Sequence, residues 1–330
     1  MTAFTPSGLV TQWVVSPFGT VLAVVASVAY AAILVGLHRR GDAVPVLRPI
    51  TFYLVGIGSL VLATDGGLAA FRDTSFVAAA AQSAVLAAIT PVGIALGDPL
   101  ALARRALGER RATVLDRVVT GRTARIVMFP LLASVVATGL HLALFVTPWL
   151  AASVAHPWVR ELTYAVLLGS GLLFVLPLLA DELVPAWCTA GVRVLIAFGD
   201  GLLDAVPGVV VMASPALLGT PVAAYLAARD PLWEQRLGGG AMFGVAEVVG
   251  LPLLAATILV WVRSDAREAA LVDARLDREE AQRLAAQARL APGAGQDRPD
   301  TTVEVPPGSA EGLRDRPWWE TDPRFTRRAP

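Results

Sequence analysis

Lysine is absent from this chain of 330 residues: all 27 basic residues are arginine, and Cys188 is the single cysteine. The missing lysine excludes a seven-helix retinal protein, because such a protein holds retinal through a lysine Schiff base. The lone cysteine excludes an intramolecular disulfide and a Cys-x-x-Cys redox or metal site. Charged residues are also scarce, at 16% against 55% hydrophobic residues, and the mean hydropathy is +0.61. This balance predicts a polytopic membrane protein.

Apolar runs long enough to cross a bilayer recur along the chain and predict an all-α fold with about seven transmembrane helices. The second run is the weakest, because it is short unless it extends through Asp65 and the glycines that follow. The expected spans are Ser16–Leu37, Pro49–Ala63, Thr74–Leu96, Ile126–Val146, Val159–Ala180, Gly191–Ala213 and Gly240–Val262.

Arginines gather in alternate loops between these runs. The loop after the first run holds Arg39, Arg40 and Arg48, and the loop after the third run, between residues 97 and 125, holds seven more. Because basic residues are enriched in cytoplasmic loops, these loops are expected to be cytoplasmic. The pattern predicts an N-terminus outside the cell, a C-terminus in the cytoplasm, and a location in the plasma membrane.

The chain is expected to have three parts. Residues 1–262 form the transmembrane domain, and residues 263–290, rich in Ala, Arg and acids, continue as a cytoplasmic helical extension. Residues 291–330 accumulate Pro, Gly, Asp and Thr and are expected to be disordered. The segment Leu100–Val119 predicts either an amphipathic helix on the inner leaflet or a basic loop that sets the topology.

The segment from Asp230 to Glu247 reads DPLWEQRLGGGAMFGVAE. We expect a turn at the three glycines, Gly238–Gly240, followed by the last transmembrane helix, in which Glu247 is the one charged residue. A carboxylate in lipid is costly, so Glu247 is expected to face protein or water. It is either a functional group or a structural hydrogen-bond partner of a neighbouring helix.

Other polar residues fall inside the expected spans. Asp200 and Asp204 lie four residues apart, which places them on one helix face about 40° apart. Counted from the outer end of each span, a further set reaches a similar depth, and this is compatible with one shared cavity. Asp200 falls deeper, near the middle of the bilayer. The set of similar depth is Gln82, His141, Tyr164, Asp204 and Glu247.

These residues also have structural interpretations. His141 is a metal ligand or a hydrogen-bonding partner between helices, and Gln82 and Tyr164 are expected to be packing residues. For Asp204 we favour a functional role, because burying a carboxylate in hydrocarbon is energetically costly.

Two stretches carry a family resemblance. The first lies within Asp230–Glu268 and reads WEQRLGGGAMFGVAE, with the helix that follows ending in WVRSDARE. The second begins at Gln82 and reads QSAVLAAITPVGIALGDPLALARRAL. Both stretches resemble bacterial cytochrome c oxidase assembly factors of the high-GC Gram-positive branch. The terminal RPWWETDPR is similar to tails of that branch. The resemblance implies a copper-handling membrane protein that contacts cytochrome c oxidase subunits and assists maturation of the oxidase by copper insertion or scaffolding.

The chain departs from this family at several histidines. Members carry a histidine pair spaced four apart before the proline of the third span, and those positions are Ala79 and Ser83 here. Another family histidine falls at Asp204. Copper prefers imidazole and sulfur ligands to carboxylates. The candidate metal ligands are His141, Asp204 and Glu247, and copper is the candidate cofactor. Because two of these three residues are carboxylates, we expect the set to bind copper(I) poorly, so metal binding is weakened or lost.

Two other classes of protein stay open. A proton- or cation-coupled transporter of small solutes would use Asp200, Asp204 and Glu247 as its relay. An intramembrane aspartyl enzyme would need two acids on facing helices, and the Gly-Asp-Gly at Gly199–Gly201 is a hint of that kind. The sequence offers no nucleotide-binding loop and no pairing of a nucleophile with a base, so we expect no enzyme. Membrane lipids are expected partners, and nucleic acid is not.

Overall fold

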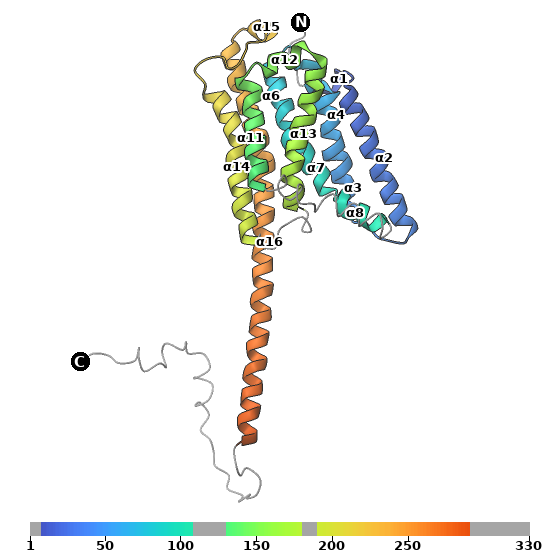
Figure 1. Cartoon of the computed structure of the whole chain (residues 1–330), viewed down its shortest axis with the longest axis vertical. Helices are drawn as coiled ribbons and strands as arrows, with labels where there is room; N and C mark the ends of the chain where they lie inside the picture. The colour runs from blue at the N-terminus through green and yellow to red at the C-terminus, as the bar shows by residue number, and fades with distance from the viewer. Residues whose placement is uncertain (1–7, 108–129, 180–189, 291–330) are drawn as a thin grey trace, which may run out of the picture. The chain divides into compact units, whose positions relative to one another are not determined.

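A computed structural model describes residues 8–107, 130–179 and 190–290. Two compact units make up the chain, Met1–Glu268 and Ala269–Pro330, and the first holds the bundle of helices in Figure 1. In the described ranges all regular elements are helical, and six helices are long and apolar enough to cross a membrane, or seven if a bent pair counts as one span. The prediction of an all-α membrane protein is therefore confirmed.

The first span is α2 (Pro17–Arg39), which follows the short α1 (Gly8–Thr11). Ser16 caps α2, because its side-chain oxygen accepts a hydrogen bond from the Gly19 amide at 3.1 Å. Pro17 occupies the first helical position, where its missing N–H costs nothing. The span begins one residue after the predicted start and ends two residues after the predicted end.

The second span is longer than expected. It runs through α3 (Leu47–Ile50), the π-helix η1 (Thr51–Ile57), α4 (Gly58–Thr64) and α5 (Gly67–Phe71). Residues Leu47–Phe71 together qualify as a span, so this span does extend through Asp65 and the glycines beyond it.

The third span contains a second π-helix. Its segments are α6 (Phe76–Ala84), η2 (Val85–Ile89) and α7 (Thr90–Leu96), and α8 (Pro99–Ala106) follows. The π-helix comes just before Pro91, which has no N–H to donate to the preceding turn, so a wider turn is accommodated there. α8 is the described part of the segment Leu100–Val119, and residues 108–129 lie outside the described ranges.

The next spans keep close to their predicted limits. α11 (Pro130–Val146) bends by 69° into α12 (Trp149–Ala155) across Thr147 and Pro148. α13 (Pro157–Leu179) and α14 (Ala190–Ala213) follow, with the short α15 (Ala223–Leu226) after them. The first residues of the predicted fourth span, 126–129, lie outside the described ranges, as does residue 180.

The last span corrects the sequence-based expectation. α16 runs from Pro231 to Leu290, so the turn predicted at Gly238–Gly240 is wrong and all three glycines are helical. Asp230 starts the helix: its Oδ1 accepts a hydrogen bond from the Trp233 amide at 3.0 Å, and Pro231 fills the first helical position. Residues 263–290 lie within α16, and the predicted disordered tail, 291–330, lies outside the described ranges.

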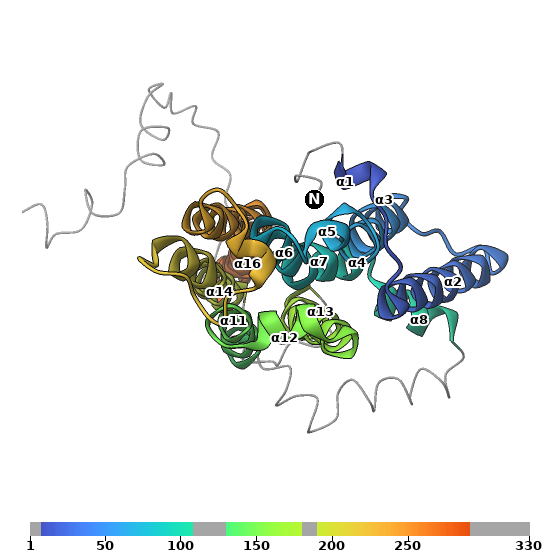
Figure 2. The same ribbon diagram turned by 90° about the horizontal axis from the view of Figure 1, so that it is seen from above.

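The glycines serve helix packing instead of a turn. A Cβ atom on Gly239 would lie 2.5 Å from the Met212 amide nitrogen of α14, and one on Gly208 would lie 2.7 Å from the Phe243 nitrogen of α16. On the α6 side, a Cβ on Gly238 would lie 2.6 Å from the Phe76 ring. α14 and α16 therefore touch backbone to backbone, and they lie side by side in Figures 1 and 2.

Candidate functional site

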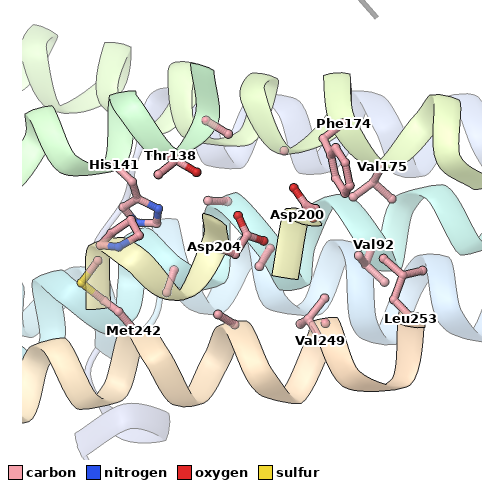
Figure 3. Close-up of a pocket in the computed structure, with 18 residues that line it drawn as sticks. Val92, Thr138, His141, Phe174, Val175, Asp200, Asp204, Met242, Val249 and Leu253 are labelled. Carbon is pink, nitrogen blue, oxygen red and sulfur yellow. The ribbon is translucent and has the colours of Figure 1, made fainter. Parts of the chain in front are cut away.

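A small cavity lies inside the bundle, between α11, α13, α14, α16 and the third span. Its volume is about 50 Å³. About 10–15 Å³ is enough to hold one water molecule, so this cavity has room for a few waters or a single ion. The polar residues that line it are Thr138, His141, Asp200 and Asp204 (Figure 3).

The two aspartates line this cavity from one turn of α14, as their spacing predicts. Asp200 is buried, and its Oδ1 accepts a hydrogen bond from the Ser134 hydroxyl of α11. Asp204 is half-buried, and its carboxylate has no hydrogen bond to any residue in the described ranges. The two acids therefore share a helix, whereas an aspartyl enzyme needs them on facing helices.

His141 enters the same cavity from α11. Its Nε2 lies 3.0 Å from the Ser83 hydroxyl of α6, and that hydroxyl donates its proton to the Ala80 carbonyl at 2.8 Å. When Nε2 donates to Ser83, Nδ1 of the neutral ring keeps a lone pair. One turn earlier, the Thr138 hydroxyl is buried and has no hydrogen-bond partner in the described structure.

Met242 is a cavity residue that sequence reasoning missed. It extends from α16 into the end of the cavity occupied by His141, and Asp204 lies between this end and the end where Asp200 lies (Figure 3). A thioether is a soft ligand that suits copper(I). Helical spacing in the sequence could have indicated that Met242 lies on the cavity face of α16, because the residues on that face are spaced three or four apart. They are Met242, Ala246, Val249, Gly250 and Leu253.

The remaining candidates do not join this cavity. Glu247 is half-buried on another face of α16, and Gln82 and Tyr164 belong to a separate network. The described ranges hold no group of three His, Cys, Asp or Glu residues that could bind a metal ion. The combination of His141, Asp204 and Glu247 is therefore not assembled in this structure, although the first two of them line one cavity.

A buried arginine, also missed from the sequence, organises the second polar cluster. Arg72 follows α5 and is 2% exposed. Its Nε donates to the Gln82 Oε1 at 2.9 Å, and its guanidinium donates to the Ser153 hydroxyl at 2.9 Å and to the Ser153 carbonyl at 3.2 Å. Gln82 in turn donates to the Tyr164 hydroxyl at 2.9 Å. The cluster joins the second, third and fifth spans to α12.

Two further contacts extend this cluster. Asp73 bridges Arg72 at 3.2 Å and Arg160 of α13 at 3.0 Å. The Tyr225 hydroxyl of α15 donates to the Arg72 carbonyl. Burial raises the pKa of Tyr225 above the usual phenol range, so its hydroxyl stays protonated at neutral pH.

Two carboxylates hold the beginning of α2. Asp65 accepts hydrogen bonds from the Ser16 amide at 2.9 Å and the Thr20 hydroxyl at 2.7 Å. Glu161 accepts from the Ser16 hydroxyl at 2.6 Å and the Phe18 amide at 3.1 Å. Anionic groups at a helix N-terminus satisfy its free amides and complement the helix dipole, so this arrangement is structural.

Comparison with known proteins adds to this geometry. Residues 28–264 match the model of the cytochrome c oxidase caa3 assembly factor family. The chain belongs to this family. The match starts inside α2 and ends inside α16, so it includes all the cavity residues and the Arg72 cluster. The family resemblance noted in the sequence is thus confirmed, and with it the membrane location.

The curated relatives are uncharacterized mycobacterial proteins. Proteins of Mycobacterium bovis and Mycobacterium tuberculosis are each 26% identical over 266 residues, which is 77% of this chain and 40% of theirs. A protein of Mycobacterium leprae is 23% identical over 269 residues, again 77% of this chain and 40% of its own length. This chain therefore spans about 40% of the length of these relatives. No solved structure matches it.

Proposed function

We propose that this membrane protein assists the assembly of cytochrome c oxidase without itself catalysing a reaction. Membership of the assembly factor family over residues 28–264 carries the proposal. The fold supports it, because an apolar helical bundle places the protein in the same membrane as the oxidase subunits. Contact with those subunits is part of the proposal.

A strain that lacks this protein tests the proposal directly. We expect it to lose cytochrome c oxidase activity and the copper content of the oxidase, and to regain both when the chain is restored. Normal oxidase activity and copper content in the deletion strain would contradict an assembly role.

We further propose that the protein carries a copper ion for the oxidase. Copper is the metal that the family resemblance implies, and the cavity offers three different donors for it: the Nδ1 lone pair of His141, the thioether of Met242 and the carboxylate of Asp204. Copper(I) favours nitrogen and sulfur ligands, so His141 and Met242 would hold the ion, and Asp204 would balance its charge. The cavity volume of about 50 Å³ suits one ion.

Metal content after copper(I) loading tests this cargo. We expect about one copper per chain by mass spectrometry, and at least a tenfold loss in His141→Ala and in Met242→Leu. His156→Ala is the matched control, because His156 lies in the turn between α12 and α13, away from the cavity. A wild-type protein without copper would leave assembly by scaffolding and remove the metal proposal.

A coupled transporter is the second candidate, and one observation favours it: two carboxylates, Asp200 and Asp204, line the same intramembrane cavity. Such acids serve as relays in transporters. If solute uptake into vesicles depended on this chain and Asp204→Asn abolished it, a transporter would replace the assembly proposal. Equal uptake with and without the chain would remove this candidate.

A further inference from the structure

One face of α16 carries Gly240, Gly244 and the half-buried Glu247, and both glycines on it are open. A Cβ atom on Gly240 or on Gly244 would meet nothing within 4 Å, whereas one on Gly239 would collide with α14. At about 100° per residue, the positions of these three residues fall within about 60° of one another around the helix. We call this the bare face of α16, because no other helix of the described structure packs against its two glycines, whereas Gly239 packs against α14.

Exposed apolar side chains continue this face toward both ends. Trp233 is 56% exposed and Leu251 is 59% exposed, and helical spacing places both on the side of Gly240 and Gly244. Two glycines spaced four apart on an exposed transmembrane face allow another helix to approach backbone to backbone.

A groove leads into this face. It has a volume of about 1000 Å³ and lies at the end of the bundle where α15 connects α14 to α16. Gly240 belongs to both the groove and the bare face. Besides Gly240, α16 lines the groove with Trp233, Glu234, Arg236, Leu237 and Ala241. The other lining residues are Thr74 and Ser75 before α6, Val77 in α6, Met212 of α14, and Ala224, Ala227 and Ala228 in and after α15. Such a shape admits the end of a helix.

Glu247 decides what occupies the face. It lies about 12 Å along the helix from Gly239, at about 1.5 Å per residue, and is therefore within the apolar part of α16. Its carboxylate has no hydrogen bond or ion pair to any residue in the described ranges. Lipid chains offer no donor, so a carboxylate at this depth calls for a protein partner that supplies one.

The same acid disfavours a second copy of this chain. A twofold contact through Gly240 and Gly244 repeats the same surface on both molecules and would bring each Glu247 close to its own copy. Two carboxylates would then face each other in hydrocarbon, which is unfavourable. A different helix with a donor at this level satisfies both the glycines and the acid.

We propose that the Gly240, Gly244 and Glu247 face of α16, with the groove beside it, is the docking surface for a transmembrane helix of a cytochrome c oxidase subunit. That helix carries small residues opposite the glycine pair and a hydrogen-bond-donating side chain, such as an arginine or an amide, opposite Glu247. The inference rests on the proposed assembly function and identifies where the partner binds.

Photo-crosslinking in native membranes tests the surface. A photoreactive amino acid at Leu251 of the full-length protein is expected to capture an oxidase subunit through a peptide of its transmembrane segment, identified by mass spectrometry. Gly244→Leu and Glu247→Leu should each lower the yield at least tenfold. Gly36→Leu is the matched control, because Gly36 in α2 is also open, with nothing within 4 Å of a Cβ atom, and should leave the yield unchanged.

The outcomes separate this inference from the assembly proposal. Crosslinks to lipid, to a second copy or to a protein outside the oxidase would overturn the docking surface, and so would an undiminished yield in Gly244→Leu. If deletion of the chain abolishes oxidase activity but Gly244→Leu restores it fully, the surface is wrong and the assembly function stands. If deletion leaves the oxidase intact, the assembly function itself fails.

Discussion

Arg72 shows how a single side chain can join several spans. Its guanidinium is buried and donates to Gln82 and to Ser153, which lie in the third span and in α12. Replacement by leucine would leave these acceptors buried without a donor. We expect Arg72→Leu to lower the free energy of unfolding by about 3 kcal/mol, measured by thermal unfolding in detergent micelles.

Arg275 provides the control for this substitution. It also pairs with an acid, Glu279, at 2.9 Å, but its side chain is 79% exposed. An exposed pair of this kind contributes little, so Arg275→Leu should change the free energy of unfolding by less than about 0.5 kcal/mol. Equal effects of the two substitutions would show that burial of Arg72 is not what gives it importance.

Tyr225 makes the stability depend on alkaline pH. Its pKa is raised by burial, and its hydroxyl donates to the Arg72 carbonyl. A pKa raised on folding means that the stabilisation is complete below the unfolded value, about 10, and is lost as the pH rises above it. The unfolding temperature of the wild type should therefore fall more steeply above pH 10 than that of Tyr225→Phe. Parallel curves would contradict this role.

The sequence supports prediction of single residues where spacing along one helix is sufficient. Asp200 and Asp204 share a face because they are four apart, and both line the cavity. Spacing along one helix does not predict the contacts of Arg72, because Arg72 lies between two spans and its acceptors belong to other helices. The depth of Glu247 in the bilayer stays a prediction from residue counting, whereas the rotation of α16, which turns Glu247 away from the cavity, depends on packing between helices.

At the scale of elements, adjacent glycines in α16 have opposite surroundings. A Cβ on Gly239 would lie 2.5 Å from the Met212 nitrogen, whereas one on Gly240 would meet nothing. We expect Gly239→Ala to destabilise the purified protein by about 1–2 kcal/mol through overpacking. Gly240→Ala should be neutral or stabilising by up to about 1 kcal/mol, because alanine favours the helix.

Thermal unfolding of these two variants side by side gives the measurement. The pair share a helix, a neighbourhood and a chemical change, so a difference between them reports the contact with α14 alone. Similar unfolding temperatures would show that the two helices can separate at little cost.

Hydropathy predicts the limits of most helices, but the start of α16 differs from the prediction because the expected turn at Gly238–Gly240 is helical. Three consecutive glycines indicate a turn in a soluble chain, because glycine weakens helices. In a membrane bundle the same residues let helices touch, and the unbroken α16 satisfies all backbone groups within itself. The capping pattern of Asp230 and Pro231 was the signal for the true start, and it preceded the glycines by several residues.

At the scale of the whole molecule, the orientation of the termini stays a prediction. Counting the bent pair α11 and α12 as one span gives seven, and an odd number places the two ends on opposite sides. We expect a C-terminal alkaline phosphatase fusion to be inactive and a C-terminal green fluorescent protein fusion to fluoresce, since both report a cytoplasmic end. Phosphatase activity at the C-terminus would reverse the assignment from the arginine loops.

The way in which α2 is held has a consequence for biosynthesis. Its beginning is tied to Asp65 and Glu161, which lie 49 and 145 residues further along the chain from Ser16. A ribosome therefore makes α2 before both carboxylates, and Glu161 follows much later than Asp65. Until then the beginning of α2 lacks its contact with Glu161, and a mean hydropathy of 2.4, the highest of the six unbent candidate spans, favours its place in the bilayer. Synthesis of α13 then completes the attachment of α2, because Glu161 lies 145 residues after Ser16.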